Sequence, residues 1–221
     1  MKKIKIVEIE SLLIRIISIV VFIIILTTCI VTYVAHSLQN KKCEYTCDVY
    51  RDNIELKYQS TKSQVIDEID KYIKQVAPNS ALNAITLFNL CEEYGVDIKF
   101  VLAQGHIESH FGTKGIARKT NSVFNVFAFD GQEYHKISRK GKYDHPDYSI
   151  EPYLKLLKNN YMVGKTEYDL MNKFVNVDSK RYASDPLYEN KLSNKFEYIS
   201  NNTKLDELIS NYRMYKIILL N

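Results

Sequence analysis

One carboxylate, Glu108, has the sequence surroundings that favour acid catalysis. It lies within DIKFVLAQGHIESHFG, residues 97–112. Winding this stretch as a helix at about 100° per residue puts Glu108 between Val101 and Phe111, on the apolar side. A carboxylate that faces apolar groups is costly unless it is paired or protonated. Such surroundings suit a general acid, which must hold its proton near neutral pH.

Two other interpretations of this helix stay open. Glu108 could be a structural glutamate at the rim of a core helix. His106 and His110 stand four residues apart and could ligate a metal. Glu108 projects from the opposite face, however, so the arrangement differs from the zinc-protease motif H-E-x-x-H. We therefore expect a solvated polar strip at the histidines and predict no metal site and no cofactor.

Three segments in order carry a family pattern. The first reads A-Q-x-x-x-E-S-x-[WF]-G, the second N-x-[LV]-F and the third Y-A-[TS]-D-x-x-Y, and YSIEPYLKLLKNNY (148–161) matches an S-[IV]-x-x-Y helix. The matching residues are Ala103, Gln104, Glu108, Ser109, Phe111, Gly112, Asn121, Val123, Phe124, Tyr182, Ala183, Ser184, Asp185 and Tyr188. Together they resemble the glucosaminidase family of peptidoglycan hydrolases, family 73 of the glycoside hydrolases in the lysozyme superfamily. Ordered segments are far more specific than a single E-S pair.

The resemblance implies an endo-β-N-acetylglucosaminidase that cleaves the β-1,4 bond of peptidoglycan glycan strands. Glu108 would be the general acid, and Tyr182 would lie near the reacting sugar. A hairpin brings a second carboxylate in the family, and Glu133 is the only Glu in the corresponding stretch here. The same resemblance assigns substrate contacts to Gln104, Phe111, Asn121, Phe124 and Tyr188.

Two alternatives share the resemblance. A lytic transglycosylase also uses one E-S glutamate, but it usually carries G-L-M-Q after it, where this chain has NSVFNV. A wall-binding or assembly protein could keep a lysozyme-like fold without turnover. Phe111 in place of the commoner Trp and a short hairpin favour that second alternative, whereas the retained Glu108 opposes it.

The N-terminal part of the chain predicts a membrane anchor. Residues 16–35 carry no charge over 20 positions, which is long enough to cross a bilayer. Four basic residues precede this run and two follow it closely, so we expect the N-terminus inside and the large domain outside. The expected organisation is a cytoplasmic segment (1–15), a transmembrane helix (16–36), a polar tether (37–62) and a glucosaminidase-like catalytic domain (63–221).

Net charge and cysteine positions bear on which molecules the chain binds and on whether it forms a disulfide. A net charge of +4 on 221 residues, without a matching motif, argues against nucleic acid. Cys43 and Cys47 could form a disulfide outside the cell, or remain free thiols.

After residue 62 the spacing of apolar residues predicts mostly helices. Helices are expected from about Ser63 to Val76, after Asn79-Ser80 to Gly95, from Asp97 to Gly112, and in four further segments after Ser149. Residues 123–143 predict one small β-hairpin around Asp130-Gly131. The expected fold is a mainly α, lysozyme-like α+β domain with one small hairpin behind a single transmembrane helix.

Overall fold

The computed structural model describes residues 2–127 and 133–220 and divides the chain into two units, Met1–Leu56 and Lys57–Asn221. Helix α1 (Lys2–Val76) supplies the first unit and begins the second. Within α1 the side chains of residues 2–12, 14, 40 and 42–48 are not described. The pairing of Cys43 with Cys47 therefore lies outside the described residues.

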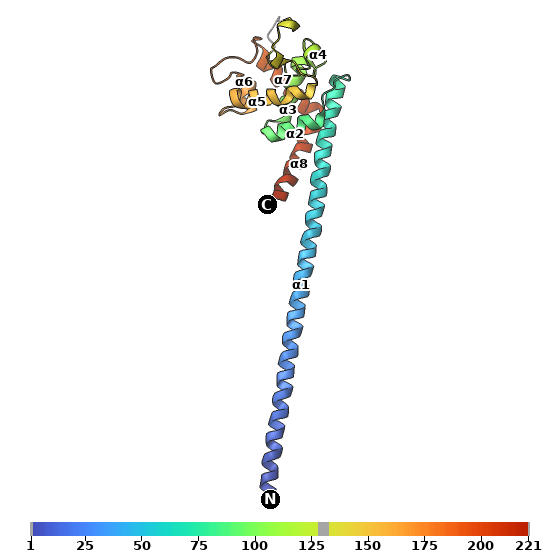
Figure 1. Cartoon of the computed structure of the whole chain (residues 1–221), viewed down its shortest axis with the longest axis vertical. Coiled ribbons are helices and arrows are strands. Elements are labelled where there is room, and N and C mark those ends of the chain that lie inside the picture. The colour runs from blue at the N-terminus through green and yellow to red at the C-terminus, as the bar shows by residue number, and fades with distance from the viewer. Residues whose placement is uncertain (1, 128–132, 221) are drawn as a thin grey trace. The chain divides into compact units, whose positions relative to one another are not determined.

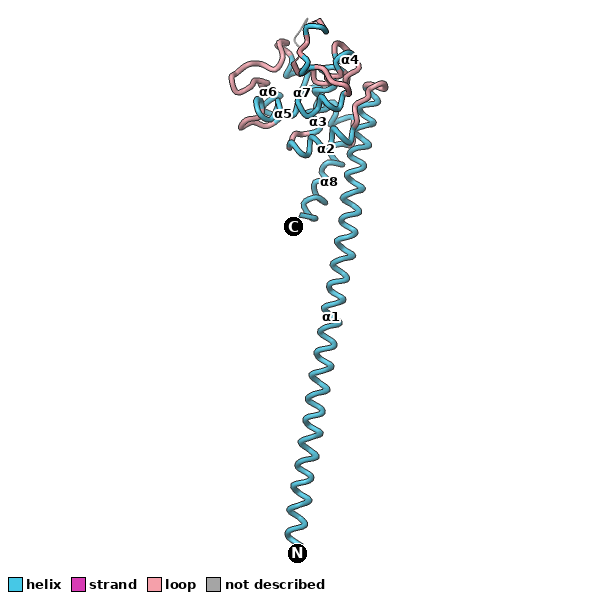
Figure 2. The backbone as a smooth tube through the Cα atoms, in the orientation of Figure 1, coloured by secondary structure: helices cyan, strands magenta, loops and turns pink. Residues whose placement is uncertain are grey.

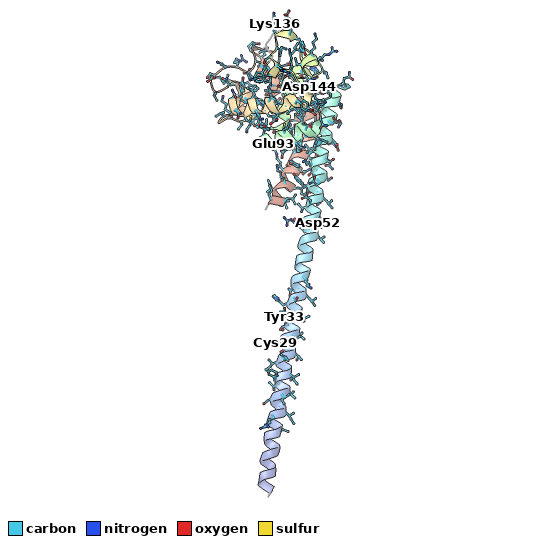
Figure 3. All side chains as sticks on the ribbon, in the orientation of Figure 1. Cys29, Tyr33, Asp52, Glu93, Lys136 and Asp144 are labelled. Atoms are coloured by element: carbon cyan, nitrogen blue, oxygen red, sulfur yellow. The ribbon has the colours of Figure 1, made fainter. Side chains whose placement is uncertain are left out.

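The first unit contains an apolar helical stretch. Arg15–Gln39 has 25 residues with a mean hydropathy of 2.7, which is long and apolar enough to cross a membrane. Cys29 and Tyr33 project from it, and Tyr33 is 77% exposed (Figure 3). A signal sequence near an N-terminus has the same length and composition. Residues 37–62, expected as a tether, are helical and belong to α1.

The second unit is built from helices (Figure 1). The last part of α1 belongs to this unit and is followed by α2 (Ala84–Tyr94), α3 (Ile98–Ser109) and the short α4 (Ala117–Thr120). Three 3-10 turns follow as η1 (Tyr134–Lys136), η2 (Arg139–Gly141) and η3 (Pro146–Ser149). The remaining elements are α5 (Ile150–Leu156), the π-helical turn η4 (Leu157–Tyr161), α6 (Glu167–Asn172), α7 (Tyr188–Asn202) and α8 (Leu205–Leu220). The expectation of a mainly helical domain is confirmed.

Helix boundaries follow the expected caps in part. Asp97 caps α3 by accepting a hydrogen bond from the Lys99 amide, and Gly95 ends α2 in the left-handed conformation. Thr166 opens α6 with a full capping box. Two boundaries were wrong. Asn83 caps α2 in place of Asn79-Ser80, and α3 ends at Ser109 because His110, with φ 48°, takes the left-handed position expected of Gly112.

Helix α3 is the centre of the second unit. Nine of its residues are buried, at positions 98–105 and 109, because other elements cover nearly its whole circumference. Helix α7 packs along it, and α2 lies against it as well. Gly105 permits close packing inside this core, since a Cβ there would lie 3.0 Å from Cδ1 of Phe111. Only the last turn of α3 reaches the surface, and Glu108 lies in that turn.

The β-hairpin is not formed by the described residues of 123–143 (Figure 2). Left-handed conformations at Asn125 (φ 50°) and Phe127 (φ 63°) interrupt the extended run. The returning segment folds into local turns, in which the amides of Lys136 and Gly141 bond to carbonyls three residues earlier. The predicted turn at 130–131 lies outside the described residues. Among the described residues the only β pairing is an isolated bridge between Val175 and Arg181.

Candidate active site

Glu108 is half-buried where α3 meets α7. Tyr188, the first residue of α7, donates its hydroxyl hydrogen to Oε1 of Glu108 over 2.5 Å. Tyr188 is only 7% exposed. Burial, followed by the Glu108 charge, raises the pKa of Tyr188 well above its usual value. Tyr188 therefore remains a neutral hydroxyl and a hydrogen-bond donor.

A buried amide supports that tyrosine from behind. Gln104 is fully buried one turn before Glu108, and its Nε2 donates to Oη of Tyr188 over 2.9 Å. Its Oε1 accepts the hydroxyl hydrogen of Tyr153, and these two partners fix the orientation of the amide. Hydrogen bonds therefore run in one direction from Tyr153 through Gln104 and Tyr188 to Glu108. Such a satisfied buried network holds its members in one geometry.

The second oxygen of Glu108 faces Asn125. Nδ2 of Asn125 donates to the backbone carbonyl of Glu108 over 3.0 Å and lies 3.3 Å from Oε2 of its carboxylate. The same carboxamide has a buried Oδ1 without a hydrogen-bond partner among the described residues. Asn125 was missed at the sequence level. Its position directly after the N-x-[LV]-F segment was the available signal.

Tyr182 lies in an aromatic group next to this network. Its ring stacks on Phe174 at a centroid distance of 4.5 Å and lies 5.6 Å from the ring of Tyr188. Its hydroxyl donates to the carbonyl of Phe124 over 3.2 Å. Burial and the nearby Glu108 charge raise the pKa of Tyr182 well above its usual value, so it also stays neutral. The structure thus brings Tyr182, Tyr188 and Gln104 together around Glu108.

Three other expected site residues have packing or loop contacts. Phe111 and Phe124 are each 1% exposed, and the Phe124 ring stacks on Tyr153 at 3.7 Å. Asn121 is left-handed (φ 53°), and its Nδ2 donates to the carbonyl of Tyr143 over 2.9 Å. These contacts fix the loops that follow α3. Any contact of these three residues with a substrate stays a prediction.

Glu133 stands apart from the network in its contacts. Its side chain is 62% exposed, lies 3.1 Å from Nε2 of His135 and forms an ion pair with Lys136 at 3.2 Å. These partners belong to the next turn of chain, η1, so Glu133 begins that turn as a solvated carboxylate. Its role as a second catalytic group stays a prediction.

We expected a solvated polar strip at the histidines. In the structure His106 of α3 and the capping residue His110 are both half-buried. Nδ1 of His106 lies 2.7 Å from Oη of Tyr72, and the His106 ring contacts that of His110 at 4.9 Å. Burial, then the charges of Lys195, His110 and Lys114, lowers the pKa of His106 to about 4. Within the described part of the chain, no group of three or more His, Cys, Asp or Glu side chains could hold a metal ion.

Comparison with known proteins identifies the family of the chain. Residues 85–201 match the glucosaminidase family, described as mannosyl-glycoprotein endo-beta-N-acetylglucosaminidase. The chain belongs to that family, which is family 73 of the glycoside hydrolases. It is 31% identical over 131 residues to two proteins of Streptococcus pneumoniae, strains TIGR4 and R6, each named "Putative endo-beta-N-acetylglucosaminidase". The matched region covers 58% of this chain but only 19% and 18% of those proteins.

Proposed function

We propose that this chain is a membrane-anchored peptidoglycan hydrolase, an endo-β-N-acetylglucosaminidase with Glu108 as its general acid. The observation that carries the proposal is the half-buried Glu108 carboxylate, held at Oε1 by Tyr188 and flanked at Oε2 by Asn125. Family membership adds the reaction class. A single half-buried carboxylate held in one geometry is suited to protonating a glycosidic oxygen.

The two oxygens of Glu108 divide the work in this proposal. Both oxygens accept a hydrogen bond, Oε1 from Tyr188 over 2.5 Å and Oε2 from Asn125 over the longer 3.3 Å, and the proposal places the acidic proton on the more weakly bonded Oε2. Oε2 gives that proton to the bridging oxygen as the bond from C1 of N-acetylglucosamine breaks. The released sugar leaves with a free 4-hydroxyl group. Water then adds at C1 and gives a proton to a carboxylate such as Glu133. Alternatively, the oxygen of the substrate's own N-acetyl group bonds to C1 as the glycosidic bond breaks, and water afterwards opens the resulting ring and returns a proton to Glu108.

The remaining site residues take supporting roles in the proposal. Tyr182 is only partly buried, and its ring is of the kind that packs on sugar rings, whereas the buried Tyr188 holds Glu108 in place. Gln104 keeps Tyr188 oriented. Phe111, Phe124 and Asn121 fix the loops that follow α3, and the proposal assigns to them the shaping of a substrate cleft.

We further propose that residues 16–36 form a transmembrane helix with the N-terminus inside and the catalytic domain outside. The apolar stretch Arg15–Gln39 supports this proposal by its length and hydropathy. The excess of basic residues before it supports the orientation. Peptidoglycan lies on the same side of the membrane as the domain in that orientation.

The test is the release of reducing ends from purified cell walls by the full-length protein in detergent. The Glu108→Gln variant should lose about 10² to 10⁴-fold of the activity, because Gln keeps the shape but cannot deliver a proton. Mass analysis of the products separates the alternatives. A hydrolase leaves reducing ends and a lytic transglycosylase leaves anhydro-muramic ends. No products from the parent protein would favour a wall-binding role, and equal rates for parent and variant would remove Glu108 as the acid.

A further inference from the structure

A hollow that is separate from the hydrogen-bond network of Glu108 opens beside the end of α3. Its volume is about 600 Å³. Its walls are formed by residues 76–81 at and after the end of α1, by residues 111–114 after α3, by Arg118 of α4, and by Asn121 and Pro146. The lining residues are Val76, Ala77, Pro78, Asn79, Ser80, Ala81, Phe111, Gly112, Thr113, Lys114, Arg118, Asn121 and Pro146. We refer to this set as the basic hollow.

Charge distinguishes the basic hollow. Lys114 and Arg118 line it, and no lining residue is acidic. A third cation, Lys74, lies at its wall because its Nζ donates to the Ser80 carbonyl over 2.7 Å. The carboxylate next to Pro146 in sequence, that of Asp147, already accepts a hydrogen bond from the Asn83 amide.

Among the described residues, the two lining cations form no ion pair. Seven other basic side chains of the second unit form ion pairs with Asp or Glu, namely Lys71, Lys99, Lys136, Lys155, Arg181, Lys191 and Lys216. Within residues 2–127 and 133–220, neither Lys114 nor Arg118 forms such a pair. Lys114 and Lys195 also contribute to lowering the pKa of His110, after the effect of burial. The positive charge of Lys114 therefore also acts on His110, the residue that caps the end of α3.

The walls that carry these cations are fixed. Oγ of Ser80, a residue that is 4% exposed, donates to the carbonyl of Phe111 over 2.8 Å and ties the two sides together. Oγ of Ser109 accepts from the Gly112 amide over 2.7 Å and donates to the Val123 carbonyl over 2.6 Å. A preformed hollow with an arginine and a lysine can receive an oxyanion without first ordering its walls.

We propose that the basic hollow is a subsite for an oxyanion carried by the cell-wall polymer, either a carboxylate or a phosphodiester. The guanidinium of Arg118 can bind either group through two parallel hydrogen bonds, and Lys114 adds a point charge. Phe111 and Gly112 follow Glu108 by three and four residues, so the subsite lies next to the end of the helix that bears the acid. The inference rests on the proposed function for the identity of the polymer.

The experiment measures binding and needs no turnover. Full-length protein carrying Glu108→Gln, in detergent, is sedimented with intact walls, with walls stripped of phosphodiester polymers, and with glycan stripped of its peptide stems. Each binding measurement is repeated with the hollow variant, a protein that carries Lys114→Gln and Arg118→Gln in addition to Glu108→Gln. The matched control adds Lys119→Gln and Lys140→Gln, two exposed lysines that do not line the hollow. Thermal unfolding of each variant verifies that it is folded.

We expect the hollow variant to bind intact walls at least about tenfold more weakly, with the control within about twofold of the parent. A difference that disappears when phosphodiesters are removed identifies a phosphate, and one that disappears with the peptide stems identifies a carboxylate. Both results support the subsite. Equal binding by the hollow variant and the parent, or an equal loss in the control, would overturn it. Failure of the proposed function would instead appear as an absence of reducing ends from the protein with Glu108 intact.

Discussion

Tyr188 and Glu108 join α7 to α3 through one hydrogen bond of 2.5 Å, in which the phenol donates to Oε1 of the carboxylate. The two residues lie 80 positions apart in sequence, so the packing of these helices also assembles the site. Because Gln104 donates to the same phenol, the hydrogen of Tyr188 is directed at Glu108. In the proposed mechanism the transferable proton is carried on Oε2, which has the longer hydrogen bond, from Asn125.

The first prediction concerns that phenol. Tyr188→Phe keeps the ring but removes the donor to Oε1, and a hydrogen bond to a charged group is worth about 1.5–3 kcal/mol. We expect kcat on cell walls to fall about 10- to 100-fold with little change in KM. Tyr161→Phe is the control, since Tyr161 belongs to the same aromatic group and lies 5.5 Å from Tyr182. Equal kcat values for Tyr188→Phe and the control would contradict the role of Tyr188.

The second prediction concerns Asn125, which the sequence did not single out. Asn125→Gly removes the carboxamide next to Oε2 while tolerating the left-handed backbone at φ 50°. We expect about a tenfold loss of kcat with a melting temperature close to that of the parent. A large fall in melting temperature at unchanged kcat would assign Asn125 to loop structure alone.

Much of the helical framework could be predicted from sequence because its signals are local. Asp97, Thr166 and the glycine at position 95 act within one turn of the helices they cap. The family motifs also identified Glu108 and Tyr188, which the structure joins directly. Their mutual distance could not be derived, since it depends on how α7 packs on α3.

The segment 123–143 shows where local signals fail. Alternation of apolar residues suggested two strands, but a strand needs a partner, and Val123 donates its amide to Oγ of Ser149 instead. Tyr143 likewise donates its amide to the carbonyl of Thr120. These long-range contacts take the hydrogen bonds that a hairpin would use. Asn125 escaped notice for the same reason, because its partner Glu108 is 17 residues away.

The third prediction is a pH dependence of stability through His106. Its pKa is about 4 in the folded protein, below the ordinary value of 6.5, and the groups facing it are Tyr72, His110, Lys114 and Lys195. A lowered pKa means that the unfolded chain binds the proton more readily. The stability that depends on neutral His106 is therefore complete above about pH 6.5 and is lost as the pH falls towards 4.

Thermal unfolding of parent and His106→Gln between pH 4 and 7 tests this dependence. Gln can still accept a hydrogen bond from Tyr72 but does not titrate. The melting temperature of the parent should fall more steeply between pH 6.5 and 4 than that of the variant. Parallel curves would show that other groups govern the acid limb.

The fourth prediction is topological. With residues 16–36 across the membrane and the N-terminus inside, residues 37–221 are exported and remain attached. Protease added to intact or outer-membrane-permeabilised cells should digest the domain, while a cytoplasmic control protein stays intact. A protected domain, or one released after cleavage near Ala35, would contradict the anchor.

The last prediction concerns the second catalytic group. Inverting hydrolysis needs a carboxylate about 6.5–9.5 Å from the acid, and a nucleophile needs about 5–5.5 Å. Glu133 directly precedes η1 with its side chain 62% exposed, and it contacts His135 and forms an ion pair with Lys136. Exposed ion pairs of this kind contribute little free energy, so the side chain can exchange these partners for a substrate-bound water at small cost.

We therefore expect Glu133→Gln to slow turnover at least tenfold, and less than Glu108→Gln does. Glu93→Gln is the control, because Glu93 is also exposed and lies on α2. A real role for Glu133 requires that its variant fall below this control at equal melting temperature. If the two variants turn over cell walls equally fast, the substrate's N-acetyl group is the better candidate for the nucleophile, because an internal nucleophile makes a distant carboxylate dispensable. Tyr182, which already contacts the ring of Tyr188, is then the next residue to replace.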